Sequence, residues 1–243
     1  MLITDRSISK YTDSQLTKEF KEKAGNHNHY KYYSKHEYIC SILNDQSIFL
    51  SDGSNWNDLI DSNRFFTGKR FAKSFSYLKY EVVSMWMLYG DQCRGSMIDF
   101  SQASIKSIID YNLNRELQIG HFKDNQFAVD LKSKPIDLYM IDIGYYTLKD
   151  DVITNLYRSD SSYKTQIDLI NAPFYSKAYE WKNEGECRLI ASFGKKMPKG
   201  SFVRLEIPDY LIEGIMKKTY IGPSNVSSFF MKSSLDGKVR WKV

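Results

Sequence analysis

Two acidic side chains late in the sequence have a type and spacing suited to acid–base and glycosyl-transfer chemistry. In the segment Glu184-x-Glu186-x-Arg188, two carboxylates lie two residues apart and a cation follows. If Glu186 opens a strand, strand alternation places it on the same face as Arg188. One carboxylate can then hold a sugar hydroxyl and stabilise a cationic transition state, while the other orients or deprotonates a nucleophile. A surface Glu/Arg pair, which adds little stability, explains the same spacing, so spacing alone leaves both interpretations open.

Two segments before this motif carry side chains that suit a ligand site. Phe75-Ser76 ends a predicted strand, where a serine can hydrogen-bond a neighbouring carboxylate or a ligand amide. Trp86 and Tyr89 lie three residues apart and share one face of a predicted helix. The alternatives are structural, because Trp86 also suits a core anchor and Ser76 also suits a helix cap.

The run Tyr30-Lys31-Tyr32 has strand propensity, and alternation puts the two tyrosines on one face and the lysine on the other. Strand aromatics can clamp a planar ring and a lysine can reach a phosphate, although cross-strand packing explains the run equally well. His27 and His29 have no further ligands at metal-binding spacing, so no metal site is predicted. Motifs typical of P-loop, Rossmann, α/β-hydrolase and zincin enzymes are also missing from the sequence.

Local signals predict the elements that must position these residues. Strands are predicted over residues 29–33, 47–50, 70–76, 95–100, 136–146, 187–193 and 202–207. Helices are predicted over residues 12–25, from a cap at Ser34 to Leu43, over 80–89, from Ser101 onward, over 163–183 and over 211–217. This order lacks the regular βαβ alternation of a doubly wound sheet, so the predicted fold class is α+β.

Composition limits the class of protein. The chain has 243 residues, of which 42% are hydrophobic, enough for the core of one large domain. Its net charge of +5 is compatible with a phosphate-bearing ligand or a nucleic acid. Three cysteines without a CxxC pair argue against a disulfide framework or a zinc site. With no signal peptide at the start and no apolar run of about 20 residues, a cytoplasmic protein without membrane contact is expected.

Taken in order, these segments resemble a widespread bacterial family known as a domain of unknown function. Its members carry Tyr-Lys-Tyr, Asn-Asp, Phe-Ser, Met-Trp-x-x-Tyr with a later glycine, and Trp-x-x-Glu-x-Glu-x-Arg. In this chain the motifs span roughly residues 29–225 and are Tyr30-Lys31-Tyr32, Asn57-Asp58, Phe75-Ser76, Met85-Trp86 with Tyr89 and Gly95, and Trp181 with Glu184, Glu186 and Arg188.

That family is similar to the ADP-ribosyltransferase superfamily, in which side chains from three strands surround the nicotinamide end of NAD. The resemblance implies two small mixed sheets that form a cleft with flanking helices. It assigns residues 29–243 to an ADP-ribosyltransferase-like domain and residues 1–28 to an N-terminal helical accessory segment. The first-strand Arg or His of the superfamily is replaced here by Tyr-Lys-Tyr, which leaves open which member faces NAD.

The resemblance also implies residue roles. Glu186 would be the catalytic glutamate, which binds a ribose hydroxyl and stabilises the oxocarbenium ion as nicotinamide leaves. Glu184 would position the target nucleophile, and Ser76 would support Glu186. NAD, consumed as a substrate, would contact Tyr30, Lys31, Tyr32 and Arg188. Trp86 and Tyr89 would form walls of the NAD site or support it.

The function predicted from this resemblance is an NAD-dependent ADP-ribosyltransferase that acts as a bacterial toxin or an anti-phage defence effector. Its target would be a nucleic acid, RNA or DNA, or a protein, and an antitoxin protein would be a further partner. A basic chain rich in aromatic residues favours a nucleic acid. The alternatives are an NAD glycohydrolase, with water as acceptor, and a non-catalytic module that binds a nucleotide, nucleic acid or protein. The sequence determines neither the modified atom nor the oligomeric state.

Overall fold

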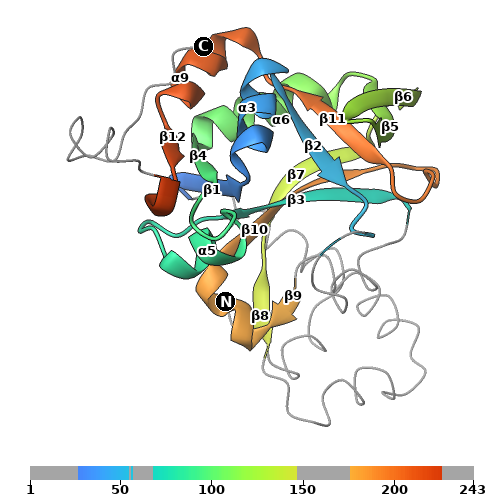
Figure 1. The fold of residues 1–243 in the computed structure, drawn as a ribbon. Helices are drawn as coiled ribbons and strands as arrows, with labels where there is room; N and C mark the ends of the chain where they lie inside the picture. Colours follow the sequence, from blue (N-terminus) through green and yellow to red (C-terminus); the bar gives the residue numbers. More distant parts are fainter. Residues whose placement is uncertain (1–26, 55, 57–67, 147–175, 226–243) are drawn as a thin grey trace, which may run out of the picture.

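The computed structural model describes residues 27–54, 56, 68–146 and 176–225 of the chain (Figure 1). The predicted helix over 12–25, the Asn57-Asp58 motif and residues 163–175 of a predicted helix lie outside this part. So does nearly all of the predicted accessory segment over residues 1–28.

A ten-stranded antiparallel sheet dominates the described part. Its strands follow the order β12-β4-β1-β3-β2-β11-β5-β6, and β10 and β7 extend it from β3. The strand bounds are β1 His29–Ser34, β2 Ser47–Ser51, β3 Arg70–Ser76, β4 Ser96–Ser101, β5 Leu117–Lys123, β6 Gln126–Ser133, β7 Asp137–Asp142, β10 Glu186–Ser192, β11 Phe202–Glu206 and β12 Thr219–Ile221. A separate two-stranded parallel sheet consists of β8 Gly144–Tyr146 and β9 Ser176–Ala178.

The sheet forks at β3. One edge of this strand pairs along its whole length with β10, from Ser76 opposite Glu186 to Arg70 opposite Ser192. The other edge is shared, because β1 pairs at Ser76 and β2 pairs at Ala72. Two arms of the sheet therefore meet on one strand, and this junction brings segments far apart in the chain together.

The fold class predicted from the sequence is wrong. The described part is mainly one large antiparallel sheet with few helices, rather than an α+β domain with two small mixed sheets, a cleft and flanking helices. The error has a physical cause. Local periodicity identifies strands, but which strands pair depends on contacts between residues far apart in sequence.

The helices cover the two faces of the sheet unequally. Their bounds are α3 His36–Asn44, α5 Val83–Leu88, α6 Gln102–Leu113 and α9 Asp209–Met216, and two short 3₁₀ turns are η1 Tyr179–Glu184 and η2 Pro223–Asn225. Figure 1 shows α3 and α6 on one side of β3, and α5 with the β8–β9 pair on the other. Helices α3 and α6 contribute Ile39 and Ile105 to the main core, which also holds Phe75 and Leu189 from the sheet. None of the helices in the described ranges is long and apolar enough to cross a membrane.

Several predicted elements are confirmed and others are corrected. The strand over 70–76 has the predicted bounds, and Ser101 caps α6 by accepting a hydrogen bond from the Ser104 amide. The cap predicted at Ser34 is wrong, because α3 has Lys35 at its N-cap with no side-chain cap. Residues 176–178, predicted to be helical, form strand β9.

The hairpin of β5 and β6 was not predicted. Its turn residues Asp124 and Asn125 both have positive φ, 48° and 62°. Positive φ at both central residues is typical of a type I′ turn, which matches the twist of the flanking strands. Strand β6 has mostly exposed residues, so it lacks the apolar alternation by which strands are predicted.

Candidate functional site

The pairing of β10 with β3 gathers the acidic motif and the serine motif on one face of the sheet. Glu186 lies opposite Ser76 and Arg188 lies opposite Ser74. Cross-strand partners in an antiparallel pair project to the same face, and so do residues two apart in one strand. All four side chains therefore share one face, as sequence alternation predicted for Glu186 and Arg188.

The same rung of the sheet continues across two more strands. Lys31 of β1 lies opposite Ser76, and on its other side it lies opposite Asp99 of β4. Asp99, Lys31, Ser76 and Glu186 thus form one row across four strands, separated by three steps of about 4.8 Å. The Lys31 ammonium donates a hydrogen bond to the Lys79 main-chain oxygen at 3.0 Å. Of the three residues in the Tyr-Lys-Tyr run, Lys31 is the one on the face of Glu186.

Donors from three described residues hold the Glu186 carboxylate. Its Oε1 accepts from Ser74 Oγ at 2.6 Å and from Arg188 Nε at 2.7 Å, and its Oε2 accepts from Lys177 Nζ at 3.3 Å. Burial raises the pKa of this carboxyl, but Arg188 and Lys177 outweigh burial and lower the pKa to about 2. Glu186 is therefore a permanent anion at neutral pH, although its side chain is only 5% exposed.

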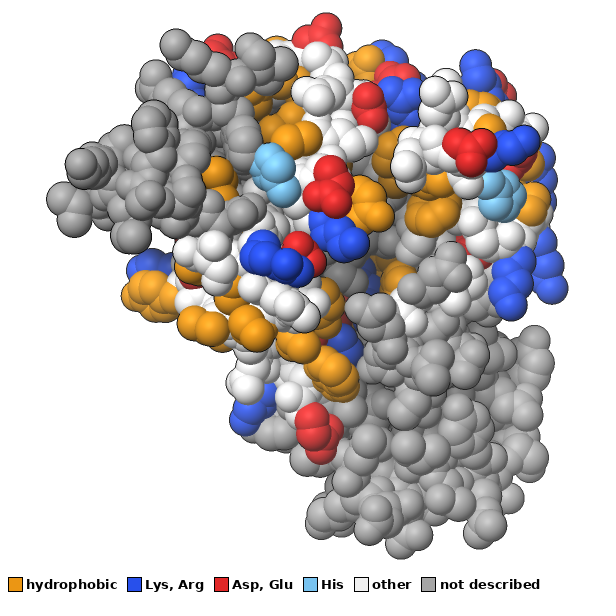
Figure 2. Space-filling view, in the orientation of Figure 1, with side chains coloured by type: hydrophobic (Ala, Val, Ile, Leu, Met, Phe, Trp, Pro, Cys, Tyr) orange, Lys and Arg blue, Asp and Glu red, His pale blue; other side chains and the backbone are white. Residues whose placement is uncertain are grey.

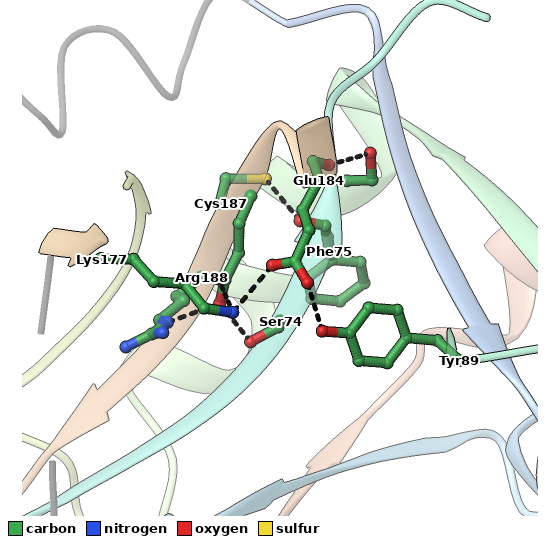
Figure 3. A network of polar contacts seen from close by, with 9 residues as sticks. Ser74, Phe75, Tyr89, Lys177, Glu184, Cys187 and Arg188 are labelled. Carbon is green, nitrogen blue, oxygen red and sulfur yellow. Dashed lines mark hydrogen bonds and ion pairs between the residues drawn. The ribbon is translucent and has the colours of Figure 1, made fainter. Parts of the chain in front are cut away.

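The neighbouring Glu184 carboxyl has a pKa that is shifted in the opposite direction from that of Glu186. Its Oε2 accepts from Lys177 Nζ at 2.8 Å, and its Oε1 accepts from the Tyr89 hydroxyl (Figure 3). Burial raises the pKa of this carboxyl, and the nearby Glu186 charge raises it further against the opposing effect of Lys177. Two neighbouring carboxyls with pKa values shifted in opposite directions are typical of sites that divide acid–base tasks.

Both cations of the cluster lie against tryptophan rings. Lys177, from β9, bridges the two carboxylates and lies 4.6 Å from the ring centroid of Trp181. The Arg188 guanidinium is fully buried and lies 4.7 Å from the ring centroid of Trp56. Cation–π contacts of this kind stabilise desolvated cations. Among the described residues, the cluster thus pairs two carboxylates with two cations.

The structure reveals contributors that sequence reasoning missed. Lys177 and Trp56 carried no sequence signal, because neither belongs to a spaced motif with the acidic residues. Ser74 did carry one, since it lies two residues before Ser76 on a predicted strand. It is Ser74 that donates to the Glu186 carboxylate, whereas the Ser76 hydroxyl donates to the main-chain oxygen of Glu184 at 2.6 Å.

Three residues predicted to bind NAD pack into or against apolar clusters. Tyr30 is buried in the main core, and Tyr32 packs against Phe75 of that core at 5.9 Å between ring centroids. Both tyrosines project to the face opposite Glu186, as the alternation of β1 requires. Trp86 is buried in a small apolar cluster, where it packs edge-on against Tyr33 at 4.9 Å. Tyr89 and Arg188 are the members of the predicted set that hydrogen-bond the two carboxylates. Lys31 shares their face of the sheet, and so does Trp86 through its contact with Tyr33.

The turn between the two carboxylates depends on Gly185. This residue has φ +50°, and a Cβ atom there would lie 2.6 Å from Leu78 Cδ2. Its carbonyl accepts from the Tyr77 amide at 2.8 Å, which ties the turn to the end of β3. A residue without a side chain therefore allows Glu184 and Glu186 to point at the same lysine.

Gly185→Ala is expected to lower the free energy of unfolding by at least about 1–2 kcal/mol, the usual cost of a left-handed L-residue, with the Leu78 contact adding to it. Equilibrium unfolding in urea measures this change in the free energy of unfolding. Gly214→Ala is the matched control, since a Cβ there meets nothing within 4 Å and the position is helical. The control is expected to gain about 0.5–1 kcal/mol. Equal stabilities of the two variants would contradict the role assigned to Gly185.

Comparison of the chain with family models, curated proteins and solved structures gave no match. Within the described ranges, no group of three or more His, Cys, Asp and Glu side chains is placed to hold a metal ion.

Proposed function

We propose that this chain is an NAD-dependent ADP-ribosyltransferase in which Glu186 is the catalytic carboxylate. Cleavage of the nicotinamide–ribose bond builds positive charge on the ribose, and a fixed anion beside it lowers the barrier. The observation that supports this role is the pairing of the buried Glu186 carboxylate with Arg188 Nε at 2.7 Å and Lys177 Nζ at 3.3 Å, two cations that lower its pKa. A carboxylate of this kind stays charged throughout a reaction at neutral pH.

Glu184 supplies the second task in this proposal. Its raised pKa suits a group that accepts a proton from an incoming nucleophile, because such a base works best with a pKa nearer to the working pH. Tyr89 and Ser76 fix the position of Glu184 through its carboxylate and its main-chain oxygen. The nucleophile would belong to a macromolecule, as expected of a toxin or anti-phage effector.

The Lys177 ammonium occupies the position that the cationic ribose would take in this proposal. Its ammonium lies between the two carboxylates and over the face of Trp181. Both carboxylates are nearly buried, so NAD reaches them only when Lys177 withdraws and the cationic ribose takes its place. Because Lys177 belongs to the separate β8–β9 pair, its withdrawal leaves the pairing of the large sheet intact.

The proposal is tested by incubating the purified chain with NAD labelled in its adenylate half, together with RNA, DNA or a cell lysate. Nicotinamide release and label on a macromolecule are both expected. Nicotinamide release without labelled macromolecule selects an NAD glycohydrolase instead. If no nicotinamide is released under any of these conditions, the enzyme assignment is wrong.

The burial of the cluster favours a second candidate, a non-catalytic binding module. All four carboxylate oxygens of Glu184 and Glu186 accept hydrogen bonds within the chain, so the cluster is satisfied without a ligand. A buried ion-pair network of this kind also serves to fix strand register. Calorimetry that detects no heat of NAD binding would select this candidate over the enzyme.

A further inference from the structure

An aromatic cluster lies on the arm of the sheet formed by β2, β11, β5 and β6. Phe49 lies 4.9 Å from Phe122 and 4.8 Å from Phe127, measured between ring centroids. Phe122 in turn lies 5.5 Å from Phe127 and 5.1 Å from Phe202. We call these four rings the aromatic platform.

The register of the strands places the platform on one face of the sheet. Phe122 lies opposite Phe127, and Phe202 lies between Ser51 on one neighbouring strand and Gly120 on the other. Only a glycine fits at this position, because a Cβ on Gly120 would lie 1.9 Å from the main-chain oxygen of Ala128 in β6. Phe122 and the adjacent Val129 are each 45% exposed, so the platform is open rather than a closed core.

Cations accompany the rings on the same face. Arg204 lies opposite Phe49, and it also lies opposite Gln118, which faces Lys132 on the next strand. The carboxylate of Glu206 on this face has Arg115 as an ion-pair partner at 3.7 Å. Figure 2 shows Lys and Arg side chains gathered at the right-hand edge of the molecule, the end where Figure 1 places β5 and β6.

The platform is continuous with the carboxylate cluster. Ser51, opposite Phe202, lies opposite Ala72 of β3 on the face that carries Ser74 and Ser76. Ser51 Oγ also accepts from the Trp56 indole at 2.8 Å, and the Trp56 ring lies against Arg188. A chain bound along the platform is therefore directed toward Glu186 and Glu184.

We propose that the aromatic platform binds single-stranded nucleic acid. Unpaired bases stack on aromatic rings whatever their sequence, and Lys and Arg beside the rings meet the phosphates. A purely apolar partner would use the rings but not Arg204 and Lys132. The net charge of +5 also favours a polyanion. A role of the platform as the acceptor surface of a transferase rests on the proposed function. Binding of nucleic acid to the platform requires neither NAD nor Glu186.

The test is fluorescence anisotropy with a short labelled oligothymidylate and a short oligouridylate, without NAD and at low salt. Phe122→Leu keeps an apolar side chain but removes the ring, and it is expected to weaken binding about tenfold. Tyr210→Leu on α9 is the matched control, an aromatic that is 72% exposed outside the platform. It is expected to bind like the unchanged chain. Lys132→Gln is expected to reduce the slope of log affinity against log salt by about 0.7.

Three results would overturn the proposal. They are no binding of either oligonucleotide at low salt, equal binding by Phe122→Leu and the unchanged chain, and equal binding of a duplex and a single strand. A thermal melt of each variant shows that it is folded, since Phe122 and Lys132 are both partly or fully exposed. Oligonucleotide binding by a variant that does not turn over NAD would support the platform independently of the enzyme assignment.

Discussion

Glu186→Gln is expected to lower the rate of nicotinamide release from NAD by about 10²- to 10³-fold, the range seen when one preorganised electrostatic group is removed from an active site. The amide keeps the shape of the carboxylate and loses the negative charge that would face the ribose cation. The measurement is nicotinamide production at saturating NAD by chromatography. Binding of NAD is expected to change far less than turnover, because the charge develops only in the transition state.

The variants around Glu186 separate catalysis from folding. Glu186→Asp keeps the anion that Arg188 requires and shifts it by one methylene, so it is expected to fold and still lose about 10²-fold. Glu184→Gln is expected to lose transfer to a macromolecule while nicotinamide release continues, since Glu184 acts on the acceptor. If a folded Glu186→Asp or Glu186→Gln variant turns NAD over at the normal rate, the catalytic role of Glu186 is wrong.

Arg188→Met is expected to lower the free energy of unfolding by about 3–5 kcal/mol at neutral pH. The guanidinium is fully buried and donates to Glu186 at 2.7 Å, so its removal leaves a buried carboxylate with less compensation. Urea unfolding measures the loss. Arg94→Met is the control, because Arg94 is 58% exposed and its ion pair with Asp91 spans 3.5 Å. That surface change is expected to cost at most about 1 kcal/mol.

The same variant is expected to change how stability depends on pH. The pKa of Glu186 is lowered from 4.5 to about 2 in the folded chain, so its stabilising contribution is complete above pH 4.5 and is lost as pH falls toward 2. Glu184 has a raised pKa, so its effect on stability has the opposite sign. It destabilises the folded chain progressively as pH rises above 4.5. Without Arg188 the pKa of Glu186 rises, and the loss of stability between pH 4.5 and pH 2 becomes smaller. An acid-induced loss in Arg188→Met as steep as in the unchanged chain would contradict this account.

Local signals in the sequence determined most of the individual elements. The alternation of β1 placed Lys31 on one face and Tyr30 and Tyr32 on the other, and the structure confirms this. Strand β3 has the predicted bounds, and the cap at Ser101 is confirmed. These features depend on side-chain periodicity and on hydrogen bonds between near neighbours, which a sequence displays directly.

Only the tertiary structure decided which of these elements meet. The register of β10 on β3 gives Glu186 the hydroxyl of Ser74, and a shift of that register would have paired the serines differently. Lys177 reaches both carboxylates from a strand outside the large sheet, a contact that no local pattern encodes. The fold class was wrong for the same reason, since strand pairing is decided by the free energy of the whole chain, through contacts between residues distant in sequence.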